Sequence, residues 1–92
     1  MITKNKIAKM LTKNFLPIYF LIEDDSASHA RHREALQSGG GHFSMIIVSQ
    51  KFAGQKMLER HRMIYKLLKP FFKKDIHALA IQAFTPDEFA KR

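Results

Sequence analysis

The side chains in this sequence best suited to binding a metal are its five histidines, because it contains no cysteine. His29 and His32 have the H-x-x-H spacing, and His42 follows ten residues later. A closed structural zinc site needs four protein ligands, and most such sites use cysteine. Neutral imidazoles in and beside a loop therefore favour an open, incomplete metal site, for which any thiolate must come from a partner.

Two further histidines lie in apolar segments, where ordinary packing explains a histidine equally well. His61 falls between Met57 and Tyr65 at helical spacing, which predicts a partly buried side chain that is hydrogen-bonded within the core. His77 shares a strand face with Leu79 but stands among the first residues of that strand, where a side chain can reach the surface. The residues alone leave both interpretations open.

Catalysis has little support in the sequence. There is no nucleophile elbow, phosphate-binding loop or cysteine nucleophile, and no carboxylate pair in an apolar context. Asp24 and Asp25 follow a strand, where loop acids are usually solvated. We therefore expect a protein that is not an enzyme.

The net charge of +8 is concentrated in two segments, residues 1–22 and residues 43–75. A basic block on a helix is typical of a surface that meets an acidic partner, nucleic acid included, although an ordinary solvated helix looks the same. Arg60 and Arg62 are expected to point outward on either side of His61. The candidate nucleic-acid or partner surface comprises Lys56, Arg60, His61, Arg62, Lys66, Lys69, Lys73 and Lys74.

Apolar periodicity predicts helices over residues 3–15 and 55–68, and Pro17 and Pro70 end them. A short helical turn is expected after Pro70, and Thr85, Pro86 and Glu88 have the spacing of a capping box that opens a last helix. Strands are expected at 17–23, 42–50 and 76–84. The order α-β-β-α-α-β-α predicts an α+β fold, a three-stranded mixed sheet with strands two and three parallel and helices packed on it.

Length and composition predict one domain over residues 1–92, with residues 24–41 as a long loop of a length typical of functional or flexible segments. No run of about 18 apolar residues is present, and the basic N-terminus lacks the pattern of a signal peptide. The expected compartment is the cytoplasm, without membrane attachment.

The segments HFSMIIVSQKFAGQKMLERHRMIYKLL and IHALAIQAFTPDEF resemble the BolA family. The family pattern has a strand that ends in V-S, an F-x-G turn, an R-H-R-M helix, an H-A-L strand and a T-P-E-E-W ending. The likeness extends back through IEDDSASH, so that it covers nearly the whole chain. Phe84 replaces a common Tyr, Asp87 replaces Glu and Phe89 replaces Trp, and each change keeps the size class or the charge.

The resemblance implies a fold like the class II KH domain and a partnership with a monothiol glutaredoxin. The chain would be a monomer alone and a heterodimer with glutaredoxin, and the two would share a 2Fe–2S cluster. The glutaredoxin and its glutathione would supply thiolates and this chain histidines, in iron–sulfur trafficking or iron and redox regulation. The H-A-L histidine is His77, and the second ligand is His29, with His32 as the alternative because no motif fixes the loop register.

The resemblance also implies an alternative function, because bacterial members of the family are described as DNA-binding transcriptional regulators of stress response and cell morphology. KH domains grip single strands through a G-x-x-G loop between two helices. This chain has KPFF at that position, so DNA would have to meet its basic helix or its strands. The glutaredoxin function ranks first, DNA regulation second and an adaptor without a cluster third.

Overall fold

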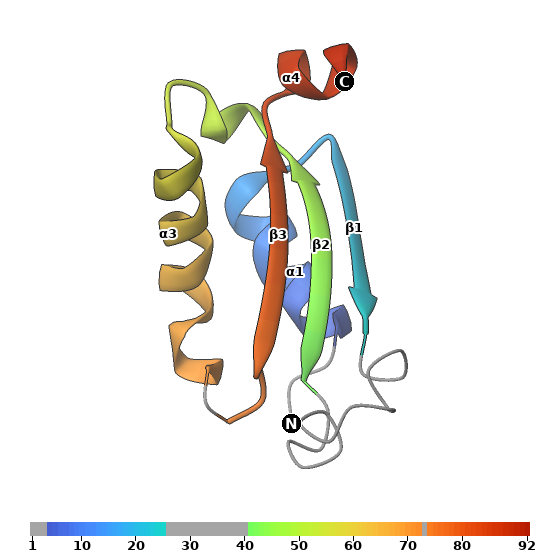
Figure 1. Ribbon diagram of the computed structural model, residues 1–92, viewed down its shortest axis with the longest axis vertical. Coiled ribbons are helices and arrows are strands. Elements are labelled where there is room, and N and C mark those ends of the chain that lie inside the picture. Colours follow the sequence, from blue (N-terminus) through green and yellow to red (C-terminus); the bar gives the residue numbers. More distant parts are fainter. Residues whose placement is uncertain (1–3, 26–40, 73) are drawn as a thin grey trace.

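The computed structural model describes residues 4–25, 41–72 and 74–92. Three strands form one sheet in the order β1-β2-β3: β1 is Tyr19–Asp24, β2 is His42–Val48 and β3 is Ala78–Phe84. β1 and β2 are antiparallel, and β2 and β3 are parallel, as the sequence predicted. The described part is therefore an α+β fold built on a mixed three-stranded sheet (Figure 1).

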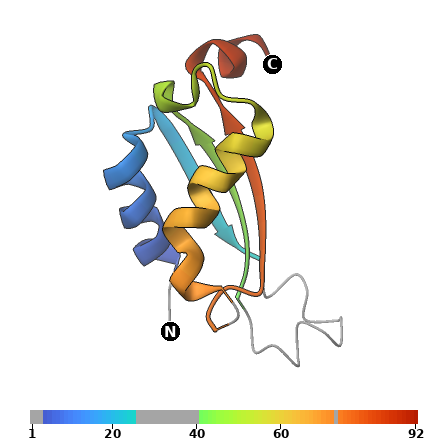
Figure 2. The same ribbon diagram turned by 90° about the vertical axis from the view of Figure 1, so that its left-hand side faces the viewer.

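Helices cover one face of the sheet and leave the other face open (Figures 1 and 2). Helix α1, Lys4–Phe15, packs on β1, and α3, Met57–Leu68, packs on β3. Two 3-10 turns, η1 at Gln50–Phe52 and η2 at Lys69–Phe71, flank α3, and a short α4, Pro86–Lys91, follows β3. The expected second helical segment after Pro70 is thus a single 3-10 turn.

The core lies between the helical layer and the sheet, because both contribute apolar faces there. Ile7 and Leu11 of α1 and Ile64 and Leu68 of α3 are fully buried. The inward residues of β2, Phe43, Met45 and Ile47, alternate with outward ones, as the two-residue period of a strand requires. Burial of these side chains is what holds α1 and α3 on the sheet, at about 25 cal/mol per Å² of apolar area.

The inward face of α3 differs from the one that the sequence predicted. Met57 and Tyr65, which have the helical spacing of an apolar face, are exposed by 47% and 40%, and Leu58 is exposed by 61%. Ile64 and Leu68 of the same apolar pattern are buried, and the third buried residue of this helix is Arg60. The helix is therefore turned so that an arginine occupies a core-facing position and several apolar side chains face solvent.

The predicted loop at residues 24–41 lies mostly outside the described residues. Asp24 is the last residue of β1, and Gly41 directly precedes β2. At the other end of the chain, Thr85 and Glu88 form the predicted capping box of α4. The Thr85 side chain accepts from the Glu88 N–H at 3.2 Å, and the Glu88 carboxylate accepts from the Thr85 N–H at 2.8 Å.

Candidate metal-binding site on the open sheet face

Two histidines lie side by side at one end of the sheet. His42 is the first residue of β2, and His77 directly precedes β3, whose first residue Ala78 is paired with His42 in the parallel register. Their ring centroids are 6.5 Å apart, with 29° between the ring planes. His77 is exposed and His42 is half-buried. The topology of the sheet thus places two imidazoles on one patch of surface.

Gly41 fixes the position of His77 against the start of β2. Its carbonyl oxygen accepts from the His77 N–H at 2.8 Å and from the Ala78 N–H at 3.2 Å. Its φ of +80° lies in the region that favours glycine, and a Cβ added there would collide with the carbonyl oxygen of Asp75 and with the His77 ring. Only glycine allows the chain before β3 to approach β2 this closely.

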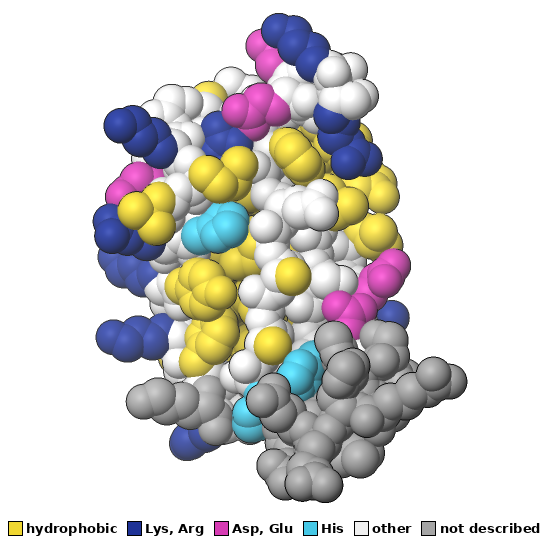
Figure 3. Space-filling model, in the orientation of Figure 1, with side chains coloured by type: hydrophobic (Ala, Val, Ile, Leu, Met, Phe, Trp, Pro, Cys, Tyr) yellow, Lys and Arg dark blue, Asp and Glu magenta, His cyan; other side chains and the backbone are white. Residues whose placement is uncertain are grey.

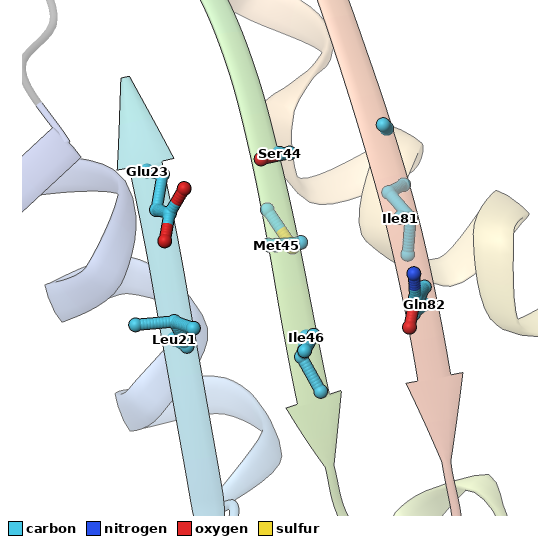
Figure 4. A pocket seen from close by; sticks show the side chains of 8 residues that line it. Leu21, Glu23, Ser44, Met45, Ile46, Ile81 and Gln82 are labelled. Carbon is cyan, nitrogen blue, oxygen red and sulfur yellow. The ribbon is translucent and has the colours of Figure 1, made fainter. Parts of the chain in front are cut away.

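A shallow hollow crosses the open face of the sheet beyond the two histidines. Its volume is about 330 Å³. Ser44 and Ala80, which lie next to each other in the register, provide little side-chain bulk in the middle of this face. Figure 4 shows the hollow and the side chains around it. The lining residues are Leu21, Glu23, Ser44, Met45, Ile46, Ala80, Ile81 and Gln82.

The histidines and the hollow form one continuous accessible region. His42, Ser44 and Ile46 alternate along β2 with the buried residues Phe43 and Met45, so all three point to the uncovered face. Figure 3, which views this face, shows histidine side chains at the lower end of the sheet, where β2 and β3 begin. A partner that binds a metal together with His77 would therefore find open sheet surface directly beside it.

The structure places only one of the predicted ligands. His77 lies in an accessible position, whereas His29 and His32 are outside the described residues. Within residues 4–25, 41–72 and 74–92, no group of three or more His, Cys, Asp or Glu side chains is arranged to hold a metal ion. The imidazoles of His42 and His77 could thus supply part of the coordination sphere of a metal. The remaining coordination positions would be filled by ligands from outside the described residues.

His42 is the neighbour of His77 that the sequence analysis did not select. The signal was available, because two parallel strands that each have a histidine at or next to their first residue bring those histidines to the same end of a sheet. Spacing along the sequence does not reveal this neighbour, because proximity across parallel strands depends on the register between them.

Arg60 is buried, so its predicted place on an outward nucleic-acid or partner surface is wrong. It is 6% exposed, and its guanidinium donates to the backbone oxygens of Gln55 at 2.8 Å and Ala83 at 3.0 Å. Both terminal nitrogens also reach the Glu88 carboxylate, at 2.6 and 3.0 Å. A buried arginine requires this kind of full pairing, and Arg60 is a structural residue that ties α4 to α3 and β3.

This contact changes the acidity of Glu88. The bidentate hydrogen bonds from Arg60, together with the N–H of Thr85, lower the pKa of Glu88 from 4.5 to about 2. Charge-assisted bonds stabilise the ionised carboxylate, and the half-exposed position of Glu88 keeps it in contact with solvent. The carboxylate belongs to the architecture of the C-terminal end and lies beyond the end of β3, whereas the two histidines lie where β2 and β3 begin.

His61 is half-buried, as the apolar stripe predicted, but its expected hydrogen bond within the core is not observed. Its Nε2 atom is buried and has no hydrogen-bond partner among the described residues. The neighbouring side chains of α3 reach β3, since Arg60 donates to Ala83 and the Tyr65 hydroxyl donates to the Leu79 carbonyl at 3.4 Å.

The other residues of the predicted basic surface are accessible where they can be described. Lys73 is outside the described residues. Arg62 forms an ion pair with Glu59, one helical turn away, at 2.9 Å. Without Arg60 the surface is a scattered set of side chains along α3 and η2. The exposed members are Lys56, Arg62, Lys66, Lys69 and Lys74.

A family model described as BolA-like protein matches residues 11–88. The chain belongs to the BolA family. One relative, the DNA-binding transcriptional regulator BolA of Escherichia coli, is 32% identical over 97% of this chain and 81% of its own length. The regulator of the same name from Haemophilus influenzae is 36% identical over 90% of this chain and 77% of its own.

A third relative is a larger BolA-containing protein. SufE-like protein 1 of Arabidopsis thaliana, a chloroplastic and mitochondrial protein, is 40% identical over 90% of this chain, which matches only 24% of that protein. The solved structure of its BolA domain has 37% identity and a TM-score of 0.78, and covers 96% of this chain and 99% of that domain. BolA1 from the same plant has 34% identity, a TM-score of 0.76 and coverage of 91% and 92%. These structures share the α+β architecture of this BolA-like chain.

In the described part of this BolA-like chain, none of the helices has the length and apolar content to cross a bilayer. The longest helices, α1 and α3, have 12 residues each, and both have charged outer faces.

Proposed function

We propose that this BolA-like chain is the non-enzymatic partner of a monothiol glutaredoxin, and that the two share a 2Fe–2S cluster in iron–sulfur trafficking or iron and redox regulation. The observation that carries this proposal is the accessible His77 beside His42 on an open sheet face, in a chain without cysteine. Iron–sulfur clusters accept histidine in place of cysteine on one iron. Imidazoles from this chain and thiolates from the glutaredoxin and its glutathione would complete such a site.

The donor set fits half of a cluster. His77 is held by the backbone of Gly41 and its ring is exposed, so the ligand is positioned without being enclosed. The second histidine would be His42, which lies at the same end of the sheet, or His29 or its alternative His32, which are outside the described residues. The open face beside these residues provides room for the partner.

Reconstitution of the cluster tests this function. The purified chain is mixed anaerobically with a monothiol glutaredoxin, glutathione, iron and sulfide, and the visible absorption and circular dichroism spectra are recorded. We expect spectra distinct from those of the glutaredoxin alone, and their loss in His77→Ala. His61→Ala removes an imidazole from α3 instead and is the matched control, which should retain them.

Single substitutions of His42, His29 and His32 by alanine then identify the second ligand, since only its loss should change the spectra. Spectra identical to those of the glutaredoxin alone, or unchanged spectra in His77→Ala, would contradict the proposal.

A second candidate function is DNA binding in transcriptional regulation. It is favoured by two relatives that carry the name DNA-binding transcriptional regulator and by the exposed lysines along α3 and η2. Because Arg60 is buried, phosphate contacts would come from residues such as Lys66 and Lys69.

A further inference from the structure

A second hollow lies on the helical side of the molecule, between α1 and α3. Its volume is about 510 Å³. α1 packs over β1 and α3 packs over β3, so the two helices diverge from each other above the sheet (Figure 2). The end of α1, the turn η1, the second half of α3 and the turn η2 all contribute to the groove. Its lining residues are Asn14, Phe15, Lys51, Met63, Lys66, Leu67 and Pro70.

The floor of this groove is apolar and its rim is cationic. Phe15 is buried, and Met63 and Leu67 are half-buried beneath the opening. Lys51 and Lys66 are exposed, and neither forms an ion pair with any described residue. Among the described residues, no aspartate or glutamate lines the groove. An occupant must therefore combine apolar groups with negative charge.

The surrounding helices extend the same electrostatic character. α1 has lysines at positions 4, 6, 9 and 13 and no acidic residue. Glu59 is the one acidic residue of α3, and Arg62 already neutralises it. At the other end of the helix pair, the Lys6 ammonium lies 5.6 Å from the centroid of the Phe71 ring. Both helices that border the groove therefore carry more basic than acidic residues, which favours an acidic partner.

The floor fits an aliphatic partner better than a nucleic acid base. Non-specific binding of single strands relies on exposed aromatic rings on which bases stack. Phe15 is 6% exposed and packs against Phe52 with ring centroids 5.2 Å apart, so it offers no such platform. Met63 in the floor and Met10, which packs on the core nearby, have the flexible thioether side chains that adapt to varied apolar helices.

We propose that the groove between α1 and α3 binds an acidic amphipathic helix of a partner protein. Its apolar side chains would enter the floor at Met63 and Leu67, and its carboxylates would meet Lys51 and Lys66. This is the helix-in-groove mode of recognition, in which apolar side chains one helical turn apart anchor the bound helix. The groove lies on the opposite side of the sheet from His42 and His77, so this site is independent of the proposed cluster.

Fluorescence anisotropy with a labelled model peptide tests this site on the complete chain. The peptide is an amphipathic helix of about 14 residues, about 21 Å long, with leucines on one face and glutamates beside them. We expect saturable binding that weakens about tenfold in the double variant Lys51→Glu, Lys66→Glu. The double variant Lys74→Glu, Lys91→Glu makes the same change in net charge outside the groove and should bind as the parent does.

Two further peptides distinguish the contribution of charge to binding from that of apolar contact. In one, glutamine replaces every glutamate; in the other, serine replaces every leucine. Both should bind at least about tenfold more weakly. Amide chemical shifts should change at Asn14, Met63 and Leu67, and His77→Ala should bind normally, so failure of the cluster proposal would leave this one standing.

Equal weakening by both double variants, or full binding of the glutamine peptide, would overturn the proposal. The proposal would also be overturned if a single-stranded oligonucleotide or anionic vesicles displaced the peptide. In that outcome the competitor binds more tightly than the peptide, and its binding depends on Lys51 and Lys66 in the same way.

Discussion

At the scale of single residues, Gly41 and Gly54 both have a positive φ of similar size but lie in different surroundings. Their φ values are +80° and +77°. A Cβ at Gly41 would collide with Asp75 and His77, whereas a Cβ at Gly54 would meet nothing within 4 Å. The pair therefore separates the cost of the left-handed conformation from the cost of steric overlap at the candidate site.

We expect Gly54→Ala to lower the free energy of unfolding by about 1–2 kcal/mol, the cost of placing an L-residue in this conformation. Gly41→Ala should lower it by about 1–3 kcal/mol more, because the chain before β3 must move away from β2. Urea unfolding of both variants measures the difference. Equal losses in the two variants would contradict the close approach at Gly41.

The same pair tests whether Gly41 positions His77. Gly41→Ala should shift the imidazole signals of His77 and His42 in a proton–nitrogen spectrum of the folded protein, and weaken the cluster spectra of the reconstituted complex. Gly54→Ala should change neither, although it too is destabilised. Unchanged imidazole signals in a folded Gly41→Ala protein would show that this residue acts on stability alone.

At the scale of elements, Arg60 connects pieces of chain that are distant in sequence. Its hydrogen bonds reach Gln55 before α3, Ala83 in β3 and Glu88 in α4. α4 has no buried residue of its own, so its attachment depends on this contact and on aromatic stacking. In that stacking, the Tyr19 and Phe89 rings have centroids 5.2 Å apart.

The Arg60–Glu88 contact predicts a dependence of stability on pH. Because folding lowers the pKa of Glu88 from 4.5 to about 2, its ionised form stabilises the fold above pH 4.5 and this contribution is lost as the pH falls towards 2. We expect the stability difference between the parent and Glu88→Gln to shrink over that interval. Urea unfolding at a series of pH values measures it.

Asp87→Asn is the control, because Asp87 is the adjacent exposed carboxylate and makes no hydrogen bond or ion pair with any described residue. It should differ little from the parent across the series. A difference between the parent and Glu88→Gln that stays constant down to pH 2 would rule out the contact as a source of acid sensitivity.

The same elements show which features the sequence could predict. The capping box of α4 was predictable because Thr85, Pro86 and Glu88 are neighbours, and the parallel pairing of β2 and β3 because a helix separates them. The role of Arg60 was not predictable, since its partner Glu88 is 28 residues away. Helical periodicity predicts that a charged side chain such as arginine faces solvent. Arg60 faces the core because two backbone oxygens and a carboxylate pair with its guanidinium.

The candidate site could be predicted only in part, because one of its contacts joins residues on different strands. The accessible position of His77 followed from its place at the beginning of a strand, and its role as a ligand remains a prediction from the resemblance. The proximity of His42 required the register between β2 and β3, in which His42 pairs with Ala78. Local spacing contains no such information, so a contact across strands was visible only in the folded chain.

At the scale of the whole molecule, the two faces of the sheet have different chemistry. The open face carries His42, His77 and the hollow around Ser44 and Ala80, whereas the helical side carries the lysines of α1 and Lys66 of α3. The net charge of +8 is therefore distributed unevenly over the surface. A partner on the open face would leave the helical side free to meet a second, acidic partner.

If DNA is such a partner, its affinity must depend steeply on salt, because each neutralised phosphate releases counterions. We expect the logarithm of the binding constant to fall linearly with the logarithm of salt concentration, and Lys66→Gln with Lys69→Gln to reduce the magnitude of that slope by about 2. Lys91→Gln, on α4, should leave the slope unchanged. Anisotropy of a labelled duplex over a salt series measures it. Lys66 lines the groove on the helical side, whereas His77 lies beside the open face, so reconstitution of the cluster should not remove the contribution of Lys66 to the slope. An affinity that does not depend on salt would contradict DNA regulation.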